Sequence, residues 1–249
     1  MIFGILSALA ITGRTVLPGG SKTDTQEMGK RVCVYTGVGA VLARDVEAAL
    51  NKLAIPYGEV DERDIREGRL RDCSALIIPG GYTARYVDAL GKEGFERIRA
   101  SVADGAGYIG ICAGAYIAAQ RVEVPGHPPG LGIIDIRNER RAGRGIRTIL
   151  TTKPGHPVVK GCEREIEIWY HNGPMIKTGE GIETLAMYDK GSAAIVCATY
   201  GVGRVLIFSP HPEGSLERGI DPQEFGTLKL LENALTFACR LKNAHGLKP

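Results

Sequence analysis

Short apolar runs rich in β-branched residues alternate along the chain with amphipathic segments of helical period. "RVCVYTG" at 31–37 and "SALIIPGG" at 74–81 have the composition of buried strands. Between them, the apolar residues of "VLARDVEAALNKL" recur at helical spacing, which predicts a helix over 41–53. Such alternation is typical of parallel strands joined by crossover helices, so the expected fold class is α/β.

The alternation continues toward the C-terminus, where strands become more frequent. The strand "GYIGIC" at 107–112 is expected to run into a helix that starts near Ala113. "SAAIVCATYGVGRVLIFSPHPEGS" at 192–215 predicts two strands joined by a Gly-Val-Gly turn. The remaining expected elements are helices around 95–103 and 222–241 and strands at 132–136, 146–151, 165–170 and 184–188.

Composition indicates a globular protein with one main domain over 31–245. The chain has 249 residues, of which 44% are hydrophobic and 24% charged, and no apolar run is long enough to cross a bilayer. A formal net charge of +3 gives no global case for binding nucleic acid or membranes.

The first thirty residues differ from the rest. "MIFGILSALAITG" at 1–13 is apolar and contains the small-residue pattern Ala8-Leu9-Ala10, and a polar stretch follows through Lys30. It can be read as an export signal or membrane tether, or as an apolar arm packed on the domain. The absence of a positive charge before the apolar run, and the shortness of that run, favour the arm and a cytoplasmic protein.

The six cysteines are widely spaced, without the close pairs of disulfide scaffolds or metal sites. Free thiols in a reducing compartment are therefore expected. The five histidines are scattered, so the sequence predicts no zinc site, and no motif indicates a cofactor.

Cys112 lies where a predicted strand turns into a helix, with Gly110 and Gly114 on either side. Glycines permit a strained turn and a close approach to the sulfur, and the start of a helix favours a thiolate. A helix terminus contributes only about 1 kcal/mol, whereas lowering a thiol pKa by about two units requires roughly 2.7 kcal/mol. A partner base is therefore expected if Cys112 is a nucleophile; otherwise it is a small core residue.

"SPHPEG" supplies that base at the end of another predicted strand. His211 can accept the thiol proton, and Glu213 can hold the other ring nitrogen, although His-Pro-Glu after a strand also occurs as a capped turn. The backbone N–H groups of Gly80, Gly81 and Ala113 are candidate donors to an oxyanion.

Two further segments are candidates for the substrate wall. "EIWYHNGPMI" at 167–176 contains Tyr170, Asn172 and Gly173, and reads equally as a loop beside the cysteine or as an edge strand; His171 is a rival base without a nearby acid. The arginines of "RNERRAGRGIR" at 137–147 are expected at the exposed tip of a β-hairpin, with a carboxylate or phosphate clamp as the alternative. No recognition motif supports nucleic-acid binding.

The elbow "GICAG", the run "YGVGRVLIFSPHPEG" and the loop "IIPGG" together resemble the class I glutamine amidotransferase-like superfamily. "IPGGY", "GICAGAY" and "WYHNGP" more closely resemble its biotin-protein ligase N-terminal domain-like branch. The resemblance covers most of 31–241 and implies a flavodoxin-like, mostly parallel sheet with helices on both faces. It also implies a Cys112-His211-Glu213 triad.

One departure limits what the resemblance implies. Glutaminase members have glutamine four residues after the nucleophile, where this chain has Tyr116, which is therefore a candidate substrate contact. The expected function is hydrolysis or acyl transfer at an amide-type C–N bond of a small molecule or peptide, through a thioester. The alternative is a non-catalytic metabolite-binding or regulatory module of a ligase-like system. A separate synthetase or ligase subunit and a homodimer are both compatible with the sequence.

Overall fold

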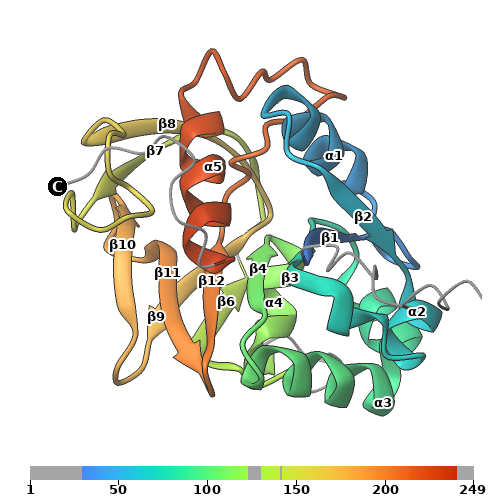
Figure 1. Cartoon of the computed structure of the whole chain (residues 1–249). Helices are drawn as coiled ribbons and strands as arrows, with labels where there is room; N and C mark the ends of the chain where they lie inside the picture. Colours follow the sequence, from blue (N-terminus) through green and yellow to red (C-terminus); the bar gives the residue numbers. More distant parts are fainter. Residues whose placement is uncertain (1–29, 123–129, 141, 240–249) are drawn as a thin grey trace, which may run out of the picture.

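A computed structural model describes residues 30–122, 130–140 and 142–239, and its strands form one twelve-stranded sheet (Figure 1). The apolar arm or signal expected at the N-terminus lies outside the described residues. The helices are α1 (Ala43–Lys52), α2 (Glu62–Arg66), the 3-10 helix η1 (Arg69–Asp72), α3 (Thr83–Ala103), α4 (Ala113–Ala118) and α5 (Thr227–Ala238).

One half of the sheet is parallel and has the strand order β2-β1-β3-β4-β12. Its strands are β1 (Arg31–Tyr35), β2 (Tyr57–Val60), β3 (Cys73–Ile78), β4 (Gly107–Ile111) and β12 (Gly203–Phe208). This order is that of flavodoxin-like sheets, whose ligands bind at the carboxyl ends of the strands. The carboxyl ends of β3, β4 and β12 lie side by side at that edge.

The other half is mainly antiparallel and continues the sheet as β11-β10-β7-β8, with β9, β6 and β5 branching from β11. The strands are β5 (Ala119–Val122), β6 (Ile134–Arg140), β7 (Arg144–Thr151), β8 (Glu165–His171), β9 (Pro174–Thr178), β10 (Glu183–Tyr188) and β11 (Ala193–Tyr200). The expected α/β class and strand-rich second half are confirmed.

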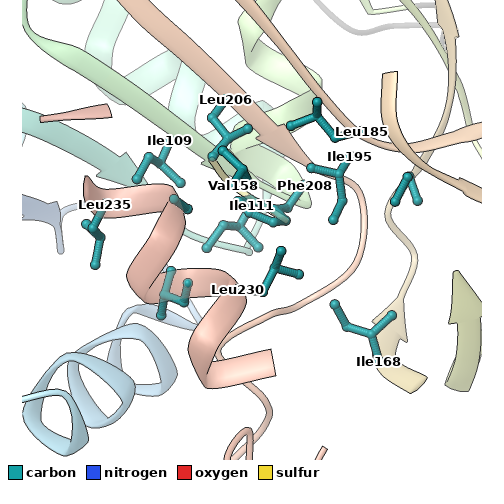
Figure 2. Packing of buried hydrophobic residues seen from close by; sticks show 14 of the residues in the cluster. Ile109, Ile111, Val158, Ile168, Leu185, Ile195, Leu206, Phe208, Leu230 and Leu235 are labelled. Atoms are coloured by element: carbon teal, nitrogen blue, oxygen red, sulfur yellow. The ribbon is translucent and has the colours of Figure 1, made fainter. Parts of the chain in front are cut away.

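Apolar side chains of the parallel strands alternate between two buried layers, because successive residues of a strand face opposite sides of a sheet. On one side they pack against α1 and α5, and on the other against α2, α3 and α4. Figure 2 shows the first layer, in which Leu230 and Leu235 of α5 lie over Ile109, Ile111 and Leu206. Packing in these two layers holds β3, β4 and β12 in place, and with them the edge of the sheet at which all three strands end.

Several boundaries differ from the sequence prediction. The helix expected around 95–103 begins at Thr83 and bends at Gly91 (φ 59°). Glycine has a low helix propensity, so the helical residues before Gly91 were not predicted. The last helix begins at Thr227 rather than near 222. The short elements β2, α2, β5 and β9 carry too few residues for a periodic pattern and were not predicted.

The expectation of free thiols is wrong for two cysteines. Cys33 of β1 and Cys73 of β3 form a disulfide across neighbouring strands, with a Cα–Cα distance of 5.7 Å. Forty positions separate them in the sequence, so no local spacing revealed the pair. Of the other four cysteines, Cys112 and Cys197 are buried thiols.

Within the ranges given above, every helix is either too short or too polar to span a lipid bilayer.

Candidate active site

Cys112 occupies a strained elbow between β4 and α4. Its backbone has φ 51° and ψ −99°, a conformation that costs a non-glycine residue about 1–3 kcal/mol and is typical of functional sites. The N–H of Cys112 donates to the carbonyl of Phe208 at 2.9 Å, which anchors the elbow to β12. A Cβ atom at Gly114 would lie 2.1 Å from the carbonyl oxygen of Ile78, so the flanking glycine lets the elbow pack against β3.

His211 and Glu213 follow β12 and form a buried pair. The distance between His211 Nδ1 and Glu213 Oε1 is 2.8 Å, and the two residues are 0% and 2% exposed. The backbone N–H of His211 donates to the carbonyl of Trp169 at 2.8 Å, which ties the backbone of His211 to β8. Glu213 therefore holds the ring, and β8 holds the backbone that carries it.

Cys112 and His211 are neighbours. Burial by itself would lower the pKa of His211, but the carboxylate of Glu213 and the sulfur of Cys112 together raise that pKa well above its usual value. The Cys112 thiol donates to the carbonyl of His171 at 3.3 Å, while Nε2 of His211 has no hydrogen-bond partner among the described residues. Turning the thiol from this carbonyl toward Nε2 would give the base its proton.

Gly80 and Gly81 lie at the end of β3, beside the elbow. A Cβ atom at Gly80 would lie 2.8 Å from Cε1 of His211, and one at Gly81 would lie 1.9 Å from the carbonyl oxygen of Gly39. Both positions therefore need glycine for close packing. Ala113 opens α4, where the first N–H groups have no intrahelical acceptor. Gly80, Gly81 and Ala113 thus lie at the same edge of the sheet as Cys112.

The residues expected to form a substrate wall also gather here. The Tyr116 hydroxyl donates to the carbonyl of Asn172 at 3.2 Å, and the Tyr170 hydroxyl donates to the carbonyl of Gly173 at 2.8 Å. Asn172 has φ 57°, and its side-chain oxygen accepts from the N–H of Gly143 at 2.8 Å. Both readings of this segment hold in part, because β8 is the edge strand of the sheet and its end reaches Cys112.

The arginine segment does not form the expected hairpin. In the described part of the chain β6 pairs with β5 and β9, whereas β7 pairs with β8 and β10. Arg144 is in register with His171, and its charge lowers the His171 pKa, although burial is the larger cause. The Arg147 guanidinium lies over the Tyr170 ring, 5.4 Å from its centroid. Arg144 and Arg147 therefore flank the candidate site.

Three contributors were not identified from the sequence. The carbonyl of His171 accepts from the Cys112 thiol, and the carbonyl of Trp169 accepts from the N–H of His211. The buried carboxylate of Asp45 accepts from the N–H of Leu216, three residues after Glu213. A contact made by a backbone carbonyl cannot be recognised from the residue types in a sequence. Asp45 lies on the buried face of α1, and a single acid on an apolar helix face was its only signal.

Replacing Glu213 with glutamine should change how stability depends on pH. The His211 pKa is raised in the folded protein, so the folded state binds more protons above pH 6.5 and its stability should fall as pH rises from there. In Glu213→Gln the main cause of the raised pKa is gone, and this fall should shrink or vanish. Urea unfolding across that range measures it.

Glu217→Gln is the matched control, because Glu217 is an exposed carboxylate on the same segment. A Glu213→Gln protein whose stability falls with pH as steeply as that of the unmodified chain would contradict the assigned charge coupling.

Comparisons with known proteins identify relatives of this chain. Residues 31–140 match the family described as "Biotin-protein ligase, N terminal". The chain is 38% identical over 148 residues to pyridoxal 5'-phosphate synthase subunit PdxT of Koribacter versatilis, covering 58% of this chain and 71% of that protein. It is 32% identical over 187 residues to PdxT of Thermus thermophilus, covering 71% and 90%.

Solved structures show the same fold at low sequence identity. PurLQS from Thermotoga maritima aligns with a TM-score of 0.64 at 20% identity, covering 84% of this chain and 99% of that chain. A glutamine amidotransferase from the same organism aligns with a TM-score of 0.55 at 15% identity, covering 85% and 98%. Sequence relatives and fold together show that the chain belongs to the class I glutamine amidotransferase-like superfamily.

Proposed function

We propose that this protein is an enzyme that cleaves an amide-type C–N bond, with Cys112 as nucleophile, His211 as base and Glu213 as the residue that positions the base. The observation that carries the proposal is the strained Cys112 elbow beside an imidazole whose Nδ1 lies 2.8 Å from a buried carboxylate. A cysteine that only filled space would not need that backbone conformation.

The chemistry follows from this arrangement. In the reactive form the thiol proton resides on His211 Nε2, which gives a thiolate–imidazolium pair, and the thiolate sulfur attacks the carbonyl carbon of the amide. The N–H groups of Gly81 and Ala113 stabilise the resulting oxyanion. The imidazolium then protonates the leaving amine, the C–N bond breaks and a thioester remains. Water, deprotonated by His211, releases the acid and restores the thiol.

Tyr116 bears on the identity of the substrate. It stands four residues after Cys112, where glutaminase members have glutamine, and its hydroxyl donates to the carbonyl of Asn172. We therefore propose a substrate other than free glutamine, a small-molecule or peptide amide. The relatives are named as subunits of a synthase, which supports a second subunit that receives the product.

Alkylation of Cys112 by iodoacetamide against pH tests the proposal without knowledge of the substrate. A thiol that can pass its proton to His211 should be alkylated rapidly, and Glu213→Gln should slow that reaction because it destabilises the imidazolium. Peptide mapping by mass spectrometry assigns the adduct. Cys162 serves as an internal control, since burial raises its pKa.

Alkylation of Cys112 that is no faster than alkylation of Cys162, and that is unaffected by Glu213→Gln, would instead favour the non-catalytic binding module.

A further inference from the structure

A second cluster of reactive side chains lies away from Cys112. Glu183 of β10 and Cys197 of β11 are direct partners in the antiparallel register, so their side chains are on the same face of the sheet. His156, in the segment between β7 and β8, reaches the same place. One ligand atom from each of these residues lies within 4.8 Å of the other two.

We propose that His156, Glu183 and Cys197 bind a zinc ion, with a water molecule as the fourth ligand. Imidazole, carboxylate and thiolate are the three protein ligand types that zinc uses, and three protein ligands with one open position is an established zinc arrangement. No residue spacing in the sequence indicates the site, because strand pairing and a loop bring its members together.

The geometry of the cysteine and histidine fits a tetrahedral ion. Sulfur at about 2.3 Å and nitrogen at about 2.0 Å from zinc would lie about 3.5 Å apart at the tetrahedral angle. The observed distance between Cys197 Sγ and His156 Nε2 is 3.7 Å. The imidazole is supported from behind, since its ring lies 5.0 Å from the ring of Phe237 on α5.

Two neighbours must adjust when the ion binds. The Lys153 ammonium lies 2.8 Å from Glu183 Oε2 and competes with the metal for that carboxylate. The N–H of Val158 donates to His156 Nδ1 at 3.2 Å, which leaves the ring proton on Nε2. Binding moves this proton to Nδ1 and breaks the Val158 contact, as expected for a ligand histidine whose other nitrogen is a donor.

Zinc binding at this site should release a defined number of protons. Cys197 is a buried free thiol, whereas zinc binds cysteine as the thiolate, so the ion must displace the thiol proton. Formation of the metal–sulfur bond expels that proton, whereas His156 only exchanges the position of its own. One proton should therefore be released for each zinc ion bound.

Cobalt(II) is the probe for the test, added to the full chain after treatment with a chelator. We expect one equivalent to bind with thiolate-to-cobalt charge-transfer absorbance and zinc to displace it. Cys197→Ser should abolish the absorbance. Cys162→Ser and Cys112→Ser should keep it, which separates this site from metal bound at the candidate active site.

Glu183→Gln keeps the test decisive if the buried Cys197 variant fails to fold, because the Glu183 side chain is 49% exposed. It should weaken cobalt binding by more than about tenfold, since loss of even an outer-shell partner has effects of that order. Glu180→Gln, at a nearby exposed position, should not. No charge-transfer absorbance, absorbance that survives in a folded Cys197→Ser protein, or an unchanged affinity in Glu183→Gln would each overturn the proposal.

Discussion

Replacing Cys112 with alanine should abolish hydrolysis of amides, lowering the rate by a factor on the order of 10⁴ to 10⁶, the loss typical of removing a nucleophile that acts in a triad. The residual rate would come from the oxyanion donors and substrate binding alone. Ammonia or amine release from a panel of amides, with glutamine included, measures the effect. The variant should fold normally, and its stability should be unchanged or slightly higher, because strained functional sites are often costly to stability.

Cys162→Ala is the matched control for this experiment, since Cys162 is a half-buried thiol remote from the elbow in the sequence and should leave turnover unchanged. Full turnover in the Cys112→Ala protein would show that the nucleophile has been misassigned. If no amide in the panel is turned over by the unmodified chain, the pH-dependent alkylation of Cys112 still separates an enzyme from a binding module.

Removing the disulfide should cost about 4 kcal/mol of unfolding free energy. The bond joins residues forty positions apart, and cross-linking a loop of that length restricts the unfolded chain by roughly this amount. The loop encloses α1, β2, α2 and η1, so the loss should destabilise the parallel half of the sheet. Urea unfolding of the Cys33→Ala/Cys73→Ala double variant measures it.

The double variant Cys162→Ala/Cys239→Ala removes the same number of sulfur atoms without removing a cross-link. It should lose much less stability, and its unfolding should shift by about 4 kcal/mol when a reductant is added to the unfolding mixture. Equal losses in the two double variants, or unfolding of the unmodified chain that is insensitive to reductant, would contradict a stabilising disulfide.

The parallel core could be predicted because its strands are buried on both faces. β1, β3 and β4 appear as short apolar runs ending in glycine or in the Cys112 elbow, and α1 repeats its apolar positions with helical period. The position of each motif at a strand end then followed from the rule that parallel strands present their carboxyl ends at one edge. The same rule predicts that Cys112 and His211 lie close together.

Strand pairing in the antiparallel half could not be predicted, because alternation marks a strand but does not choose its neighbour. The arginine segment reads as a hairpin, yet β6 and β7 take different partners. The same limitation hid the Cys33–Cys73 bond and the cross-strand pair of Glu183 and Cys197. Each depends on contacts between segments distant in the sequence.

Tyr116 has a consequence for attempts to redesign the specificity of this protein. Its hydroxyl fastens α4 to the turn after β8, the same turn whose preceding carbonyl receives the Cys112 thiol. Exchanging the tyrosine for glutamine would enlarge the space beside the sulfur but would also remove the hydrogen bond to Asn172. A test of glutamine use by substitution at Tyr116 would therefore need a second substitution that secures the turn again.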